Sequence, residues 1–168
     1  MTSTQLSAAV RHAVVDSPVG PLTMVARNGR LAGLYMAGQR HLPDEHTFGA
    51  RDDEVLPEVR EQLAAYFRGE LREFDLPLAE VGTPFQAEVW AALRRVPYGE
   101  TCTYGELAAA IGRPAVVRAV GAANGRNPIC IVVPCHRVVG STGQLTGYAG
   151  GVDKKAALLA LEQGATLF

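Results

Sequence analysis

The chain has 168 residues, of which 48% are hydrophobic and 20% charged, with a formal net charge of −1. This composition is typical of a soluble globular protein and excludes a disordered chain, because it supplies enough apolar surface for a packed core. No apolar run approaches the about 20 residues that a membrane span needs, and residues 1–10 lack the basic start of a signal peptide. We therefore expect a cytoplasmic protein.

Charge is distributed unevenly along the chain. Residues 1–80 contain 8 Lys/Arg against 12 Asp/Glu, whereas residues 81–168 contain 8 against 5. Six arginines lie between residues 94 and 137, so the second half could attract a polyanion although the whole chain is nearly neutral. The three cysteines also lie in this half, and their odd number without a C-x-x-C pair favours reduced thiols over a disulfide framework.

The first third of the chain indicates a small antiparallel sheet. We expect strands at His12–Asp16, Leu22–Ala26 and Leu31–Met36, the last two joined by a hairpin at Asn28-Gly29. The polar residues 39–53 read as a loop.

Apolar residues then recur at helical spacing from Val55 to Phe67, and Arg68-Gly69 ends that predicted helix. Residues 71–78 predict one more strand or an extended linker, and residues 79–82 read as a boundary between two units.

Two capping boxes open the second unit. Thr83–Gln86 combines an N-cap threonine, a proline at the first helical position and a glutamine, and predicts a helix to about Val96 with Trp90 in the core. Thr103–Glu106 is the second box and predicts a short helix through Ile111.

A third helix is predicted from Pro114 to about Ala123, and together with the preceding one it forms a helix-turn-helix candidate. Its surface consists mainly of alanine and glycine around the single Arg118, which would allow close approach of a backbone such as that of DNA. The alternative is that these small residues pack inside the domain.

The last part of the chain combines an apolar run with a reactive dipeptide. Residues 129–133 read as a buried strand that Pro134 ends, and Cys135-His136 follow directly. A twelve-residue glycine-rich loop, Gly140–Gly151, is of the kind that binds ligands, and Val152–Gln163 predicts the final helix.

A thiol beside an imidazole is the most informative feature for chemistry. Free cysteine has a pKa of about 8.5, so a base or a nearby positive charge is needed to form the thiolate at neutral pH. His136 and Arg137 could supply these, and Glu162 on the final helix could orient the imidazole. Cys130 reads as a small buried hydrophobe, and a metal site made of Cys130, Cys135 and His136 would lack a fourth ligand.

These residues resemble the methylated-DNA–protein-cysteine methyltransferases, the O6-alkylguanine-DNA alkyltransferases. The likeness is strong over residues 83–163 and rests on Asn127-Pro128, Pro134–Val139, Tyr98-Gly99-Glu100, Thr103–Glu106, Arg118–Gly121, Gly150-Gly151, Lys154, Lys155, Leu158 and Leu159. Shorter motifs, Ser17–Leu22 and Tyr66-Phe67-x-Gly69, look like the variable N-terminal domain of that family.

The resemblance implies that Cys135 accepts an alkyl group from guanine O6 in one irreversible displacement, so that each molecule acts once. It implies catalytic roles for Cys135, His136, Glu162, Asn127 and Tyr104. It implies DNA contacts by Arg118, Ala119, Gly121, Ala122, Thr103 and Arg126. It implies a guanine pocket formed by Pro134, Val139, Tyr148, Ala149 and Gly150.

In this reading His136 accepts the thiol proton, by way of a water molecule, while Glu162 orients the imidazole. Asn127 braces the local backbone, and Tyr104 donates its phenolic hydrogen to the departing purine. Arg118 fills the gap left in duplex DNA when the nucleotide is flipped out, as a minor-groove helix would allow.

The expected fold is α/β (α+β). A small N-terminal antiparallel-sheet domain with a helix, residues 1–80, precedes a mainly helical C-terminal domain, residues 83–168, with the helix-turn-helix and a cysteine at a strand end. The family likeness implies double-stranded DNA carrying O6-alkylguanine as partner and a monomer in solution. We expect no cofactor. We also expect no structural zinc, because the zinc ligands of some members' N-terminal domains cannot all be matched in residues 1–101, which contain no cysteine.

Three alternatives remain at this point. An alkyltransferase-like lesion sensor would lack the acceptor cysteine, so Cys135 argues against it. A helix-turn-helix regulator would need a further domain for which 168 residues leave little room. A cysteine hydrolase built on Cys135, His136 and Glu162 would turn over repeatedly and show no preference for DNA.

Overall fold

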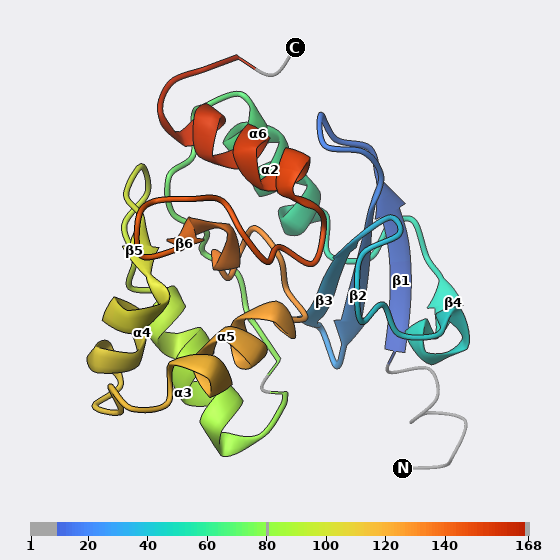
Figure 1. Ribbon diagram of the computed structural model, residues 1–168. Coiled ribbons are helices and arrows are strands. Elements are labelled where there is room, and N and C mark those ends of the chain that lie inside the picture. Colours follow the sequence, from blue (N-terminus) through green and yellow to red (C-terminus); the bar gives the residue numbers. More distant parts are fainter. Residues whose placement is uncertain (1–9, 80, 167–168) are drawn as a thin grey trace.

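The computed structural model describes residues 10–79 and 81–166. A four-stranded sheet occupies one side of the molecule and helices α3 to α5 the other, while α2 and α6 lie together at one end (Figure 1). This is the mixed α/β architecture expected from the sequence. The expectation that residues 1–10 form no signal peptide falls almost entirely on residues 1–9, which lie outside the described residues. No described helix has both the length and the apolar composition to cross a membrane.

The sheet has the order β3-β2-β1-β4. Its strands are β1 (Val10–Val15), β2 (Leu22–Arg27), β3 (Arg30–Met36) and β4 (Ala50–Arg51). The first three are antiparallel neighbours, as predicted, whereas the two-residue β4 runs parallel to β1. Asn28 and Gly29 form the predicted hairpin turn with positive φ angles of 52° and 75°, which a type I′ turn requires.

One expectation for the N-terminal part needs correction. Residues 39–53 are not only a loop, because they contain the 3₁₀ helix η1 (Glu45–Phe48) and strand β4. Phe48 anchors this segment, since it is buried and its ring stacks on Tyr35 with centroids 5.6 Å apart. Of the two forms predicted for residues 71–78, a strand or an extended linker, the structure has the linker, with one isolated bridge between Leu78 and Leu31.

The described residues also contain five α-helices. They are α2 (Pro57–Phe67), α3 (Pro84–Leu93), α4 (Tyr104–Ala110), α5 (Val117–Gly125) and α6 (Val152–Glu162). Both predicted capping boxes are present, with Thr83 and Thr103 as the N-caps. Each threonine side chain accepts a hydrogen bond from the backbone N–H three residues later, and the side chain of that later residue, Gln86 or Glu106, accepts from the threonine backbone N–H. Trp90 packs against the core but is half-buried rather than fully inside it, and its indole Nε1 donates to Ala123 O (2.8 Å), which joins α3 to α5.

Helices α4 and α5 form the helix-turn-helix unit, with boundaries that differ from the prediction. The connection spans residues 111–116, and α5 begins at Val117 instead of Pro114. Val116, the residue before the helix, has a non-helical conformation and no side-chain cap. Pro114 therefore lies in the connecting turn.

The predicted buried strand at residues 129–133 is wrong. This segment is buried but folds into tight turns, in which Val133 N–H donates to Ile129 O (3.0 Å) and Ile131 has a positive φ of 70°. Only Ile129 makes a sheet-like contact, a single bridge to Leu34 of β3. Cys135 consequently does not end a strand but opens the 3₁₀ helix η2 (Cys135–Arg137), which leads into β6 (Val138–Val139) beside β5 (Cys102–Thr103).

Candidate active site

Cys135 is held in the interior by the turns that precede it. Its exposed fraction is 6%, and its backbone N–H donates to Val133 O (2.8 Å). Burial raises the pKa of the thiol, while a hydrogen bond from Asn127 and the positive charge of Lys155 act in the opposite direction. The thiol is therefore protonated at rest and needs a base before it can act as a nucleophile.

His136 is fully buried and has the geometry of such a base. Its Nε2 lies 2.7 Å from Glu162 Oε2. An ionised carboxylate can only accept, so Nε2 carries the proton and Nδ1 is left as the acceptor. Nδ1 has no hydrogen-bond partner among the described residues, and burial lowers the pKa of the imidazole. The contact between His136 and Glu162 expected from the sequence is present.

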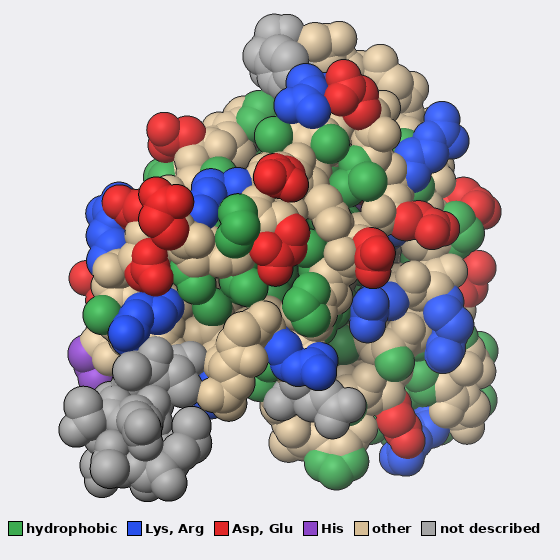
Figure 2. Space-filling model, turned by 180° about the vertical axis from the view of Figure 1, so that it is seen from behind, with side chains coloured by type: hydrophobic (Ala, Val, Ile, Leu, Met, Phe, Trp, Pro, Cys, Tyr) green, Lys and Arg blue, Asp and Glu red, His purple; other side chains and the backbone are tan. Residues whose placement is uncertain are grey.

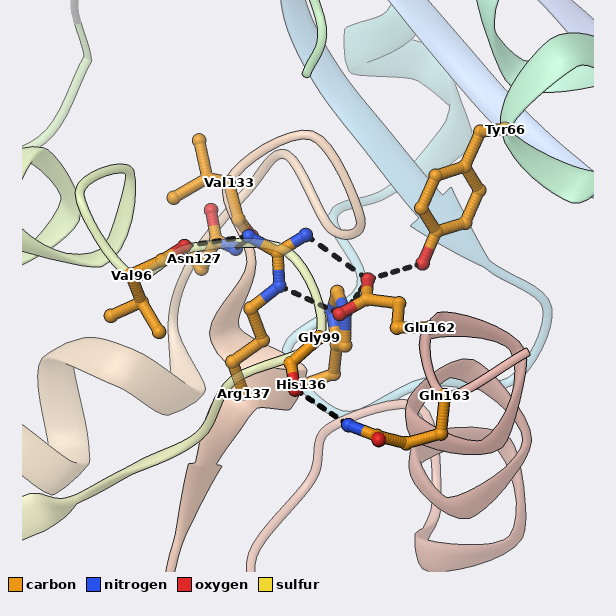
Figure 3. A network of polar contacts seen from close by, with 9 residues as sticks. All are labelled: Tyr66, Val96, Gly99, Asn127, Val133, His136, Arg137, Glu162 and Gln163. Atoms are coloured by element: carbon orange, nitrogen blue, oxygen red, sulfur yellow. Dashed lines mark hydrogen bonds and ion pairs between the residues drawn. The ribbon is translucent and has the colours of Figure 1, made fainter. Parts of the chain in front are cut away.

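Glu162 accepts hydrogen bonds from three side chains (Figure 3). Besides His136, Arg137 donates through Nε to Oε1 (2.8 Å) and through Nη2 to Oε2 (3.1 Å), and the Tyr66 hydroxyl donates to Oε2 (2.6 Å). Burial alone would raise the pKa of Glu162, but the hydrogen bonds from His136, Arg137 and Tyr66 lower it to about 2. The carboxylate is therefore ionised at all physiological pH values.

Arg137 has a different place from the one expected. Its guanidinium was predicted to support the thiolate, but it forms the two bonds to Glu162, donates to Val96 O (2.7 Å) and lies over the ring of Tyr98. It therefore acts on the carboxylate, while the positive charge that acts on Cys135 comes from Lys155.

Lys155 is a buried residue that the sequence reasoning did not place in the site. Its exposed fraction is 0%, and its Nζ donates to Val138 O and to Thr146 O, the latter at 2.9 Å. The i, i+3 spacing of Lys155 and the core residue Leu158 on α6 was the available signal, because it places both on one helix face. A lysine on a buried face needs polar partners such as these carbonyls.

Asn127 ties the turn before Cys135 together. Its Nδ2 donates to Val133 O (2.7 Å), and its Oδ1 accepts from the Ile129 N–H (3.0 Å). The side chain thus replaces the strand hydrogen bonds that residues 129–133 do not make. The bracing contacts expected for Asn127 are present.

The glycine-rich loop lies between the thiol and the N-terminal sheet. Tyr148 is buried, and Ala149 O accepts from the backbone N–H of Arg40 (2.9 Å), which follows β3. A β-carbon at Gly150 would overlap Met36 Sδ and would lie 2.9 Å from the Tyr148 ring. The wall of the expected guanine pocket therefore rests on the end of β3.

Substitution of Gly150 by alanine is expected to lower stability by about 1–3 kcal/mol, because the added methyl group overpacks a buried contact. Urea denaturation measures this loss. Gly125→Ala is the control, since a β-carbon at Gly125 meets nothing within 4 Å. An unchanged midpoint for Gly150→Ala would show that the loop moves freely away from Met36.

The surface of α5 is open rather than packed. Arg118, Ala119, Ala122 and Arg126 are exposed, and Gly121 is half-buried against the ring of Tyr104. The alternative that the small residues of this helix all pack inside is therefore wrong for its outer face.

The remaining predicted residues surround the same region. Tyr104 begins α4 and its hydroxyl donates to Thr146 O (3.3 Å). Thr103 is the half-buried N-cap of α4, and Pro134 and Val139 are buried on either side of η2. In the described residues no group of three or more His, Cys, Asp or Glu side chains is placed to hold a metal ion.

The side of the molecule opposite to the view of Figure 1 shows no separation of charge. Acidic and basic side chains are interspersed there with apolar ones (Figure 2). The uneven distribution of charge along the chain therefore does not make this face uniformly basic.

Fold and site together define a mixed α/β protein that places a buried thiol, an imidazole and a carboxylate beside an exposed helix-turn-helix. The family model of the "6-O-methylguanine DNA methyltransferase, ribonuclease-like domain" matches residues 10–79, and that of the "DNA binding domain" of the same methyltransferase matches residues 84–164.

Known proteins are similar over nearly the whole chain. The methylated-DNA–protein-cysteine methyltransferase of Mycolicibacterium paratuberculosis is 51% identical over 154 residues, which cover 92% of this chain and 93% of the relative. That of Methanosarcina acetivorans is 49% identical and covers 90% and 97%. The crystal structure of Mycobacterium tuberculosis OGT in complex with DNA has a TM-score of 0.88 at 49% identity, covering 93% and 94%. The chain belongs to the methylated-DNA–protein-cysteine methyltransferase family.

Proposed function

We propose that the protein repairs O6-alkylguanine in duplex DNA by moving the alkyl group irreversibly to its own Cys135. Family membership supports the reaction and the DNA substrate. The observation that carries the proposal is the buried Cys135 next to an imidazole whose Nδ1 has no partner among the described residues and whose Nε2 is bound to Glu162.

The proposed step is a direct displacement. The Cys135 thiol gives its proton, through a bridging water, to His136 Nδ1, and Glu162 stabilises the resulting imidazolium. The thiolate attacks the alkyl carbon, so that an S–C bond forms, the C–O6 bond breaks and its electron pair stays on the guanine. In the thioether that results, the cysteine thiolate is a poorer leaving group than the guanine was, so the alkyl group stays on Cys135 and each protein molecule acts once.

The departing guanine needs a proton donor. Tyr104 lies at the edge of the loop that forms the expected pocket, and its hydroxyl is within hydrogen-bond reach of Thr146 O. Burial raises the pKa of Tyr104, so its phenol stays protonated and can donate to the purine as negative charge develops. Tyr148, Ala149 and Gly150 would form the pocket wall with Pro134 and Val139.

We infer that α5 docks in the minor groove. Its exposed alanines permit close contact with the DNA backbone, aided by Thr103 and Arg126, and such contacts read little sequence. Because the thiol is buried, the alkylated nucleotide must leave the stack, at a cost of a few kcal/mol. The exposed Arg118, which has no ion-pair partner among the described residues, would fill the gap.

Arg118→Ala is expected to slow alkyl transfer from duplex DNA about tenfold or more, because the extruded nucleotide returns more readily to an unfilled stack. Transfer from free O6-methylguanine base should change little, since no stack has to be opened. The two rates are measured by loss of radiolabelled methyl. Arg94→Ala serves as the control, because Arg94 is also an exposed arginine but lies at the end of α3, outside the proposed docking surface. An equal loss on both substrates would contradict the flipping role.

This mechanism gives the two halves of the chain different roles. We propose an N-terminal unit, residues 1–80, that supports the site, and a C-terminal unit, residues 83–168, that binds DNA and accepts the alkyl group. One monomer suffices for one lesion, because a single chain carries the thiol, the relay and the docking helix. We propose a cytoplasmic location, because the protein has to reach chromosomal DNA.

Intact and peptide mass spectrometry after mixing with a duplex that contains one O6-methylguanine tests the proposal. The expected result is a single added methylene mass on the Cys135 peptide that saturates at one per protein. No mass change in a folded, DNA-bound protein would instead support a lesion sensor. No change and no DNA binding would support a hydrolase.

A further inference from the structure

The carboxylate of Glu162 receives one hydrogen bond from a part of the chain far from the thiol. Tyr66 belongs to α2 in the N-terminal half, and its hydroxyl donates to Glu162 Oε2 at 2.6 Å across 96 residues of sequence (Figure 3). The same oxygen accepts from His136 Nε2 at 2.7 Å. Tyr66 has an exposed fraction of 0%, so its hydroxyl cannot turn to water instead.

We propose that Tyr66 is a positioning residue for the alkyl transfer, whose hydroxyl fixes Glu162 Oε2 and thereby sets the orientation and proton affinity of His136. The inference rests on the proposed function only for its kinetic consequence. The contact itself links the N-terminal half directly to the acceptor machinery, although that half contributes no group to the reacting atoms.

The physical argument concerns one shared oxygen. A donor to a carboxylate oxygen withdraws negative charge from it, so the oxygen attracts the proton of a second donor less strongly. With Tyr66 in place, Glu162 orients the imidazole but raises its pKa less than it would without the tyrosine hydroxyl. Without the hydroxyl, the carboxylate binds imidazolium more strongly, and His136 is protonated at higher pH, where it can no longer accept the Cys135 proton.

Other charged groups around His136 act in both directions and stay in place in the variant. Arg137 and Cys135 flank it on η2, and Glu162 and Lys155 face it from α6. Burial lowers the pKa of His136 most, Glu162 raises it, and the charges of Arg137 and Lys155 lower it.

Tyr66→Phe removes only the hydroxyl and keeps the ring that packs on Phe67 and Phe74. Tyr98→Phe is the matched control, because Tyr98 packs edge-on against Tyr66 with centroids 6.3 Å apart and no hydrogen bond from its hydroxyl is found among the described residues. Single-turnover rates on an O6-methylguanine duplex are measured for both variants and the parent over a range of pH.

We expect the Tyr66→Phe rate to fall about tenfold at neutral pH. The ratio of the Tyr66→Phe rate to the parent rate should rise towards one as the pH rises and His136 loses its proton in both proteins, while Tyr98→Phe should follow the parent at every pH. A merely structural role predicts a ratio that does not change with pH, and that result overturns the inference.

A second measurement keeps the two proposals separate. Nitrogen-15 NMR of the imidazole, assigned with a His136→Gln variant, reports the titration of His136 without any substrate. An upward shift of its pKa in Tyr66→Phe supports the inference, and an unshifted titration rejects it. If the parent protein transfers no alkyl group, the proposed function fails, but this titration still decides the role of Tyr66.

Discussion

Cys135→Ala is expected to abolish alkyl transfer and to leave DNA binding unchanged. In the proposed step the Cys135 thiol forms the new S–C bond, whereas the proposed docking surface on α5 lies on the exterior and does not include it. Mass spectrometry of the variant after incubation with an O6-methylguanine duplex measures transfer, and a gel-shift titration measures affinity.

Cys130→Ala is the matched control for this experiment. Cys130 is a buried free thiol in the same set of turns, and burial raises its pKa well above the usual value. The variant should retain full transfer. Methyl transfer that persists in Cys135→Ala, or that disappears in Cys130→Ala, would contradict the assignment of Cys135 as the acceptor.

Arg137→Ala is expected to lower the free energy of unfolding by about 3–5 kcal/mol, because it leaves the carboxylate of Glu162 buried without its cation. The side chain of Glu162 is 1% exposed and accepts two bonds from this guanidinium. Urea denaturation at neutral pH measures the loss. Arg72→Ala is the control, since Arg72 also lies over the Tyr98 ring but is exposed and should matter little.

The pH dependence gives this prediction a second test. The pKa of Glu162 is depressed from its ordinary 4.5 to about 2 in the folded protein. The ionised group therefore stabilises the fold fully above its unfolded pKa, and this contribution is lost as the pH falls towards 2. The difference between the parent and Arg137→Ala should be constant at neutral pH and shrink under acid conditions. A difference that grows in acid would contradict the ion pair as its source.

Local signals in the sequence predicted the local structure. The hairpin at Asn28-Gly29 depends on two positive φ angles, and the capping boxes at Thr83 and Thr103 depend on neighbours three residues away, so each is determined within a few residues. The proximity of His136 to Glu162 was also predicted, from the chemistry that the pair could perform.

The failures have a different physical origin. Residues 129–133 are as apolar as a buried strand because they are buried, but burial does not specify whether a segment extends or turns. The turns depend on the side chain of Asn127, which satisfies backbone groups that a strand would pair. Tyr66 gave no signal because its partner is 96 residues away. Arg137 was assigned to the wrong anion, since sequence adjacency to Cys135 does not determine where a long side chain points.

The small exposed side chains of α5 also have a thermodynamic consequence for docking. Alanine and glycine lose no side-chain rotamer freedom when a partner covers them, whereas arginine loses up to about 2 kcal/mol. Ala119, Gly121 and Ala122 can therefore be covered by DNA without an entropic penalty from their side chains. In the proposed docking mode the ordering cost falls on Arg118, which would lose its rotamer freedom only on entering the duplex. In this mode, search along undamaged DNA would cost little side-chain entropy, and Arg118 would be immobilised only when the base is extruded.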